Sequence, residues 1–134
     1  MKVVLDTNVV VSGLLKPRST PSRILRLILQ GDMDIIINEH ILAEYHEVLQ
    51  RKKFSFNQKD IDRIIEIFRS YGIRAPDLLH TPRLPDPGDE PFLEAAISMQ
   101  ADALITGNKK HFPRRSCKGV SVMSPSEFLS GKTR

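Results

Sequence analysis

Short apolar segments alternate along the chain with longer segments of helical periodicity. Residues 3–5, 35–37, 103–105 and 120–122 are rich in valine, isoleucine or leucine and have the length of short buried strands. Strands that alternate with helices form a parallel sheet covered by helices. The pattern therefore predicts a three-layer α/β/α fold with a central, mostly parallel sheet of four or five strands. A chain of 134 residues is the size of one domain, so we expect a single unit over residues 1–134.

Five segments carry the signals of helices with one buried face. The clearest repeats Ile61, Ile64, Ile65 and Phe68 at i, i+3, i+4 and i+7. Capping residues mark most of the expected helix starts. The helices are expected behind Thr20-Pro21, over residues 39–52, over residues 58–70 with Asn57 as cap, from Asp89 onward, and behind a capping box at residues 124–127.

Residues 72–88 hold four prolines and cannot form a regular helix. A connection of this length inside a compact domain is uncommon and is often functional. We therefore expect a loop beside the functional site, with room for one edge strand near Ile73.

The charges are unevenly distributed. The sequence has a net charge of +4, but residues 109–134 hold seven basic residues and one acid, whereas residues 1–108 hold thirteen basic residues and fifteen acids. The C-terminal segment is therefore strongly basic, which favours an anionic partner.

Composition excludes several classes of protein. With 40% hydrophobic and 27% charged residues, the chain is neither disordered nor fibrous. The single cysteine, Cys117, rules out an internal disulfide, and the four histidines lack the paired spacing of a structural zinc site. No stretch approaches the roughly 18 apolar residues of a membrane span, and no secretory apolar core follows Met1. We expect a soluble protein of the reducing cytoplasm with no membrane partner.

Polar residues directly follow three of the predicted strands. The carboxyl ends of parallel strands meet at one edge of the sheet, where ligands bind in open α/β folds. These side chains are therefore expected to converge. They are Asp6, Thr7 and Asn8 after residues 3–5, Asn38 and Glu39 after residues 35–37, and Thr106, Gly107 and Asn108 after residues 103–105.

Two further acids can reach this edge. Glu44 lies about 60° from Ile41 around its helix and so borders the apolar face, while Asp89 begins the helix that leads to the next strand. Carboxylates crowded together repel one another unless a cation binds them. Hard oxygen ligands select Mg²⁺ or Mn²⁺. Such an ion near a basic segment suggests phosphodiester hydrolysis by metal-activated water.

Four motifs, in order, carry a resemblance to a known family. They are Val-Val-Leu-Asp6-Thr7-Asn8, Glu44 on a helix, Asp86-Pro-Gly-Asp89-Glu-Pro-Phe-Leu-Glu-Ala-Ala, and Leu-Ile-Thr106-Gly107-Asn108-Lys-Lys-His-Phe. At these residues the chain resembles the PIN-domain family, in particular the toxin-type (VapC-like) ribonucleases of toxin–antitoxin pairs. The resemblance spans nearly the whole chain.

The resemblance implies a metal-dependent endoribonuclease with Mg²⁺ or Mn²⁺ as cofactor. It implies that Asp6, Glu44 and Asp89 are catalytic and bind the metal, and that a fourth ligand position falls on Asn108, where many relatives have aspartate. It also implies three partners, namely RNA, a cognate antitoxin protein and a second copy of the chain in a homodimer.

Other residues are expected to support this site. Hydroxyl, amide and carboxylate groups next to metal ligands can orient them or a water molecule, and a basic cluster can bind phosphates, although it can also be only a solvated face. The candidates are Thr7, Asn8, Asp86 and Thr106 beside the metal, and Lys109, Lys110, Arg114 and Arg115 at the RNA.

Ordinary structural roles remain open for several of these positions. Glu44 could be a solvated helix residue, Asp89 is a good helix cap in any case, and Asn108 could serve a turn. Glu90 and Glu94 are expected to face solvent, and no role is assigned to the histidines or to Cys117.

Two other functions compete with the nuclease. An apolar run followed by Asp6 also begins phosphatases that use an aspartyl nucleophile, but these need a second aspartate where this chain has Asn8. The other alternative is a catalytically inactive PIN-like binding module, which the amide at Asn108 favours. A glycine-rich phosphate loop is absent from the sequence, so nucleotide hydrolysis is disfavoured.

Overall fold

Five parallel strands form the sheet, in the order β3-β2-β1-β4-β5. The computed structural model describes residues 1–76 and 84–132, so residues 77–83 of the predicted loop lie outside the described part. The predicted three-layer α/β/α fold is confirmed. The strands are β1 (Lys2–Leu5), β2 (Asp34–Ile37), β3 (Ile73–Arg74), β4 (Ala103–Ile105) and β5 (Val122–Met123).

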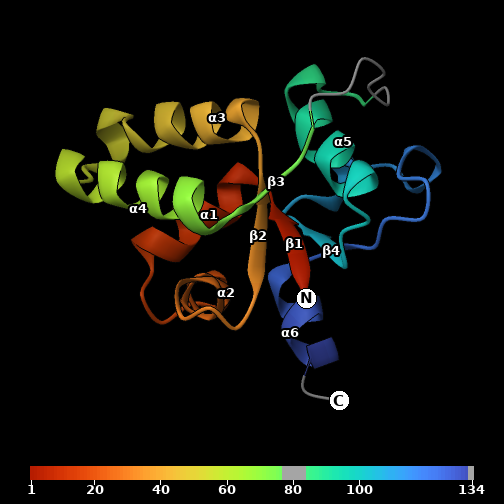
Figure 1. Ribbon diagram of the computed structural model, residues 1–134, viewed down its shortest axis with the longest axis horizontal. Coiled ribbons are helices and arrows are strands. Elements are labelled where there is room, and N and C mark those ends of the chain that lie inside the picture. The colour runs from red at the N-terminus through yellow and green to blue at the C-terminus, as the bar shows by residue number, and fades with distance from the viewer. Residues whose placement is uncertain (77–83, 133–134) are drawn as a thin grey trace.

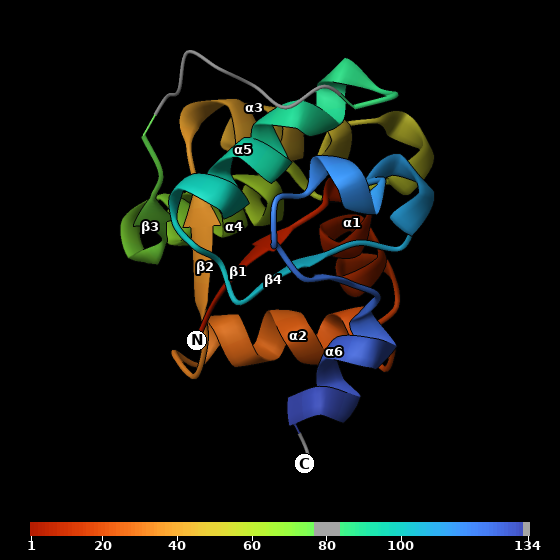
Figure 2. The same cartoon turned by 90° about the vertical axis from the view of Figure 1, so that its right-hand side faces the viewer.

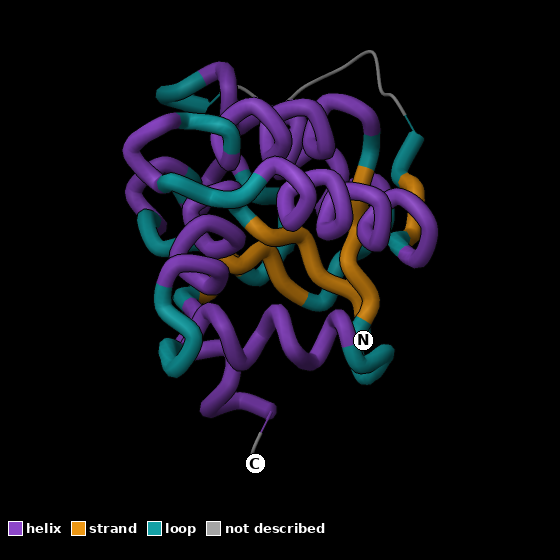
Figure 3. Tube along the Cα trace, turned by 90° about the vertical axis from the view of Figure 1, so that its left-hand side faces the viewer, coloured by secondary structure: helices purple, strands orange, loops and turns teal. Residues whose placement is uncertain are grey.

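The helices cover both faces of the sheet, with α1 to α4 on one side and α5 on the other (Figure 1). Right-handed crossovers explain this division, because the chain moves from β1 to β2 to β3 in one direction and then returns to β4. Figure 3 shows the strands behind the first group of helices. The bounds are α1 (Thr7–Leu15), α2 (Thr20–Leu29), α3 (Glu39–Leu49), α4 (Gln58–Tyr71), α5 (Glu90–Ser98) and α6 (Pro125–Lys132).

An aromatic cluster joins three helices to the end of the central strand. The Tyr45 ring on α3 lies 5.8 Å from that of Phe68 on α4 and 6.1 Å from that of Phe92 on α5, between ring centroids. Its hydroxyl donates a hydrogen bond of 2.6 Å to the backbone carbonyl of Leu5, the last residue of β1. All four residues are buried. The hydrophobic core therefore fixes the strand end from which the polar residues follow.

Helix α1 was not predicted, because its sequence lacks a helical pattern. Three consecutive valines and Gly13 lower its helix propensity, and apolar residues lie on nearly all sides. The structure forms it because packing overrides propensity. A Cβ atom on Gly13 would lie 2.5 Å from Leu25 Cδ1, so the glycine allows α1 and α2 to pack closely.

Two helix caps differ from those predicted. Ser19, not Thr20, caps α2 by accepting a hydrogen bond from the Ser22 amide. Asp89 precedes α5, but its carboxylate makes no capping hydrogen bond. The side chain that was expected to serve as a cap is therefore not used for that purpose.

Other element boundaries also shift. Helix α3 ends at Leu49, short of the predicted residue 52. Strand β5 begins at Val122 because a turn with positive φ at Lys118 and Gly119 precedes it. The expected edge strand near Ile73 is present as β3.

The capping predictions for the other two helices are confirmed. Asn57 caps α4, and Ser124 and Glu127 form the predicted capping box at α6. Among the described residues, none of the helices is both long enough and apolar enough to cross a membrane.

Replacing Tyr45 with phenylalanine should destabilise the protein by about 1–3 kcal/mol, because the buried Leu5 carbonyl loses its hydroxyl donor. Urea denaturation measures the effect. Tyr71→Phe is the matched control, since Tyr71 is 81% exposed, and it should leave the midpoint unchanged. Equal midpoints for both variants would show that the Tyr45 hydroxyl does not stabilise the strand end.

Candidate active site

The candidate site lies at the carboxyl ends of β1 and β4, where the chain connections diverge to opposite sides of the sheet. Asp6 directly follows β1, and its amide donates to the carbonyl of Ile105 at the end of β4. The next residue, Thr106, donates from Oγ1 to Asp6 Oδ2 at 2.7 Å. Both side chains are buried, with Asp6 only 5% exposed. Two strands distant in sequence therefore hold one carboxylate in a fixed orientation.

Glu44 is brought to this edge by α3. Asn38, which follows β2, accepts a hydrogen bond of 2.8 Å from the Ile41 amide and caps the helix. Tyr45 anchors the same turn in the core. Thr7 Oγ1 donates a hydrogen bond to Glu44 Oε2. The half-buried Glu44 carboxylate is therefore held against the first residue of α1, next to Asp6.

Two aspartates approach from the segment before α5. Asp86 Oδ1 accepts a hydrogen bond of 2.9 Å from the Gly88 amide and so forms the short turn Pro87–Asp89. A Cβ atom on Gly88 would lie 3.2 Å from Asp86 Oδ1 and 4.0 Å from Glu44 Oε1, which places this turn beside Glu44. Asp89 ends the turn with only 8% of its surface exposed.

Asp89 Oδ2 is a buried oxygen without a hydrogen-bond partner among the residues described. His111 Nδ1 lies 3.1 Å from it, but the contact is not aligned as a hydrogen bond. The other ring nitrogen, Nε2, lies 3.0 Å from Asn108 Nδ2. No role was predicted for His111. Its position three residues after Asn108, on the turn that follows β4, was the only sequence signal that could have indicated its place in the site.

Burial and mutual repulsion raise the pKa of three carboxyl groups here. Burial is the main cause of the raised pKa of Asp6, which the hydrogen bond from Thr106 partly offsets. Burial is also the main cause of the raised pKa of Glu44. The hydrogen bond from Thr7 opposes this shift, and the weaker repulsion from Asp6 and Asp86 adds to it. The pKa of Asp89 rises to about 6, through burial first and then through Asp6 and Asp86. These shifts show that the carboxylates share one electrostatic environment.

The side-chain oxygens of this site are the kind of ligand that a hard cation binds. Among residues 1–76 and 84–132, however, no group of three or more histidine, cysteine, aspartate or glutamate side chains stands close enough together to hold a metal ion. The fit to a cation rests on the unpartnered Asp89 Oδ2 and on carboxylates whose charged forms are disfavoured by their neighbours. The predicted ligand set of Asp6, Glu44, Asp89 and Asn108 stays a prediction.

The other predicted site residues occupy varied positions. Thr7 and Thr106 each bind a carboxylate, as described above, whereas Asn8 is exposed on α1. Glu94 was expected to face solvent but is buried, with 8% of its surface exposed, because it lies on the side of α5 that packs inward. Glu90 is also not free in solvent, since its Oε2 accepts a hydrogen bond from the Leu84 amide.

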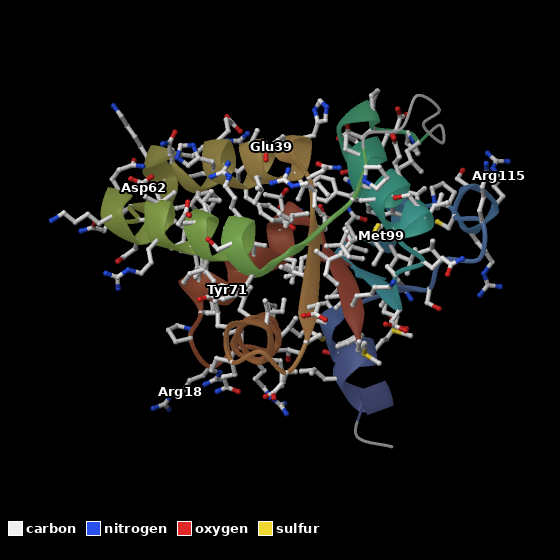
Figure 4. All side chains as sticks on the ribbon, in the orientation of Figure 1. Arg18, Glu39, Asp62, Tyr71, Met99 and Arg115 are labelled. Atoms are coloured by element: carbon white, nitrogen blue, oxygen red, sulfur yellow. The ribbon has the colours of Figure 1, made fainter. Side chains whose placement is uncertain are left out.

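The predicted RNA-binding residues lie on the segment after β4 and are exposed. Lys109 Nζ pairs with Glu127 at 2.9 Å. The pKa of that glutamate is lowered to about 2, first by the hydrogen bond from the Ser124 backbone amide and then by the bond from Lys109. Lys110, Arg114 and Arg115 form no ion pair within the described ranges. Figure 4 shows Arg115 at the outer rim of this segment, directed away from the helices.

Comparison with known proteins identifies the family. A family model described as PIN domain matches residues 2–110, which is most of the chain. The chain belongs to the PIN domain family. This PIN domain is 31% identical over 140 residues to the uncharacterized protein MJ1680 of Methanocaldococcus jannaschii, with 96% of this chain and 90% of that protein covered.

Solved structures share the fold of this PIN domain at low sequence identity. VapBC2 from Rickettsia felis, bound to a DNA fragment from its promoter, gives a TM-score of 0.59 at 20% identity and covers 91% of this chain and 97% of that chain. VapBC-1 from nontypeable Haemophilus influenzae gives a TM-score of 0.60 at 19% identity and covers 94% of this chain and 99% of that chain. FitAcB from Neisseria gonorrhoeae gives a TM-score of 0.57 at 15% identity and covers 92% of this chain and 98% of that chain.

In chelator, the free energy of unfolding of this protein should fall as pH rises from about 4 to 6. The folded state holds a proton on Asp89 up to a pKa of about 6, whereas the unfolded chain releases it near 3.8. The stabilisation present below pH 4 is therefore lost as pH passes through the folded pKa. Asp89→Asn should flatten this pH dependence in urea titrations.

The exposed Asp32→Asn is the matched control and should keep the wild-type profile. A wild-type free energy of unfolding that rises steadily from pH 4 to 6, or an Asp89→Asn profile identical to wild type, would contradict the raised pKa of Asp89.

Proposed function

We propose that this PIN domain is a metal-dependent endoribonuclease that hydrolyses RNA phosphodiester bonds and acts as the toxin of a toxin–antitoxin pair. The observation that carries the proposal is the crowding of Asp6, Glu44, Asp86 and Asp89 at one strand edge, with Asp89 Oδ2 buried and unpartnered. Such an arrangement is unfavourable in a protein without a ligand and favourable where a cation binds.

Asp6, Glu44 and Asp89 would hold a Mg²⁺ or Mn²⁺ ion, with Asn108 as a further oxygen ligand. The ion would supply Lewis-acid activation of water and would stabilise negative charge that develops on the phosphate. The protein would hold the ligand carboxylates in a fixed orientation. Thr106 fixes the Asp6 carboxylate, Thr7 fixes Glu44, and the aromatic cluster around Tyr45 keeps the strand end and α3 in place.

The basic segment after β4 supports RNA as the substrate. Lys110, Arg114 and Arg115 follow the site by only a few residues and carry charges that no described acid pairs. Phosphate groups are the natural partners of such exposed cations. In Figure 2 this segment runs close to α5, whose first residues adjoin Asp89. RNA bound there would reach the carboxylates.

The proposed partners rest on the comparisons. The structural neighbours are VapBC and FitAcB assemblies, which supports a cognate antitoxin protein for this chain. The homodimer is proposed from the resemblance to toxin-type PIN domains alone. An RNA target would place the protein in the cytoplasm.

An inactive binding module is the second candidate. Asn108 supplies an amide where an acid would add charge, and the carboxylates of the described residues do not close around a cation position. Membership of the PIN domain family favours both candidates over the aspartyl-nucleophile phosphatase. Cleavage of RNA separates the two.

Asp6→Asn should lower the rate of RNA cleavage in saturating Mn²⁺ or Mg²⁺ by at least about 100-fold, because losing even a group that only orients a metal ligand costs about 10- to 100-fold. The assay is cleavage of labelled RNA, with circular dichroism as the check on folding. Asp32→Asn should cleave at the wild-type rate. Undiminished cleavage by Asp6→Asn would rule out the metal assignment, and a wild type that binds RNA without cutting it would establish the binding module.

Replacing Lys110, Arg114 and Arg115 together with glutamine should weaken RNA binding equally across sequences. Each lost phosphate contact should reduce the slope of log affinity against log salt by about 0.7. Lys109 is kept, because its replacement would also break the pair with Glu127.

The control replaces Arg18, Arg23 and Arg26, three exposed arginines on or before α2. Figure 4 shows Arg18 at the opposite end of the molecule from Arg115. Equal salt slopes for the two triple variants would show that the segment after β4 is only a solvated surface.

A further inference from the structure

We propose that Asp86 supplies the fourth negative charge of the carboxylate site, a charge that the neutral Asn108 does not provide. The proposal rests on the proposed function, because it assigns a role toward the same cation. It goes beyond the supporting role expected for Asp86, since it makes the charge of this residue a determinant of metal affinity. Binding measurements test it without any cleavage of RNA.

Asp86 lies beside Glu44, on the turn that leads into α5. Its Oδ1 accepts a hydrogen bond of 2.9 Å from the Gly88 amide. A Cβ atom on Gly88 would lie 3.2 Å from Asp86 Oδ1 and 4.0 Å from Glu44 Oε1, so both carboxylates border the same small region. Asp86 is exposed, whereas Asp89 at the end of the same turn is buried. The turn therefore places one carboxylate inside the protein and one at its surface, next to Glu44.

Asp86 acts electrostatically on all three predicted acidic ligands. After burial, its repulsion is among the causes that raise the pKa of Asp6, Glu44 and Asp89. Because Coulomb interactions weaken with distance, a charge that acts on three separate carboxylates lies close to the region between them. A cation bound in that region would be attracted by Asp86 for the same reason that the carboxylates are repelled.

The oxygens near this region are unequally occupied. Asp89 Oδ2 is buried and has no hydrogen-bond partner among the described residues. Asp86 Oδ2 also forms no hydrogen bond or ion pair within the described part of the chain. The side-chain amide of Asn108, in contrast, lies 3.0 Å from the ring of His111 and carries no charge. A cation that binds Asp89 Oδ2 would therefore gain a further negative charge from Asp86 and none from Asn108.

The charge of Asp86 can be removed without removing the turn. Asparagine and aspartate both accept a hydrogen bond from the backbone two residues further on, which is the bond that Asp86 makes with Gly88. Asp86→Asn thus removes the charge and keeps the bond, whereas Asp86→Ala removes both. Comparison of the two variants separates an electrostatic role from a structural one.

Calorimetric titration of the full chain with Mn²⁺ measures the effect. Asp86→Asn should weaken Mn²⁺ binding about 10-fold, because a divalent ion several ångströms from a unit charge gains an attraction of that order even in water. Asp32→Asn is the control and should bind Mn²⁺ as wild type does, since it removes an exposed charge from the segment before β2, at the opposite edge of the sheet.

Two results would overturn the proposal at this stage. One is an Asp86→Asn variant that binds Mn²⁺ as tightly as wild type while Asp86→Ala binds it weakly, because only the turn would then matter. The other is unchanged affinity in both variants. A wild type that binds no Mn²⁺ would overturn the metal assignment and this proposal together.

Moving the charge from one segment to the other tests the substitution directly. Asn108→Asp introduced into the Asp86→Asn variant returns the site to its original total charge, so Mn²⁺ affinity should return toward the wild-type value. Asn108→Asp alone should bind Mn²⁺ more tightly than wild type. A double variant that binds no better than Asp86→Asn would show that the two positions are not alternative sources of the fourth charge.

The effect on RNA should have the opposite sign. Asp86 is exposed, and its carboxylate repels phosphates when no cation is bound. In chelator, Asp86→Asn should therefore bind RNA more tightly than wild type although it binds Mn²⁺ more weakly, and weaker binding of both would show a structural role instead. If the wild type binds Mn²⁺ and RNA but cuts no RNA, the proposed ribonuclease fails while these binding measurements still decide the role of Asp86.

Discussion

The burial of neighbouring carboxylates at one edge of the sheet is the constraint around which this molecule is organised. Asp6, Glu44 and Asp89 approach one another from a strand end, a helix and a turn, and each has a pKa raised mainly by burial. Isolated acids would avoid such a place. Asp6 and Glu44 are kept there by two threonine hydroxyls and the backbone of β4, and Asp89 is kept there by the turn that Asp86 forms. The fold thus holds these carboxylates close together although their charged forms are disfavoured there.

Tyr45 shows how closely the core and the site are connected. Its ring packs against two other helices while its hydroxyl binds the last carbonyl of β1. The preceding residue is Glu44. A single turn of α3 thus contributes one residue to the core and one to the carboxylate cluster, so a shift of this turn would disturb both. Thr106 likewise serves both the fold and the site, because it ends the pairing of β4 and orients the Asp6 carboxylate.

The sequence predicts most of the fold and part of the site. Strands at 3–5, 35–37 and 103–105 were predictable because continuous apolar runs mark strands buried on both faces, and the strand-end rule placed Asp6 beside Thr106. Helix α1 was not predictable, because its stability comes from packing against α2 and not from its own pattern. The pairing of Lys109 with Glu127 and the position of His111 depend on how the segment after β4 folds back, which no periodicity encodes.

The order of the strands has a consequence for biosynthesis. The central strand β1 is synthesised well before its partner β4, which lies about a hundred residues later, and the contact between Asp6 and Thr106 spans that same interval. Contacts so distant in sequence form late and slowly, because the loop between them must close first. The carboxylate cluster is therefore assembled only after residue 106 has been synthesised, and a nascent chain that stops before that residue has neither a complete central sheet nor the oriented Asp6.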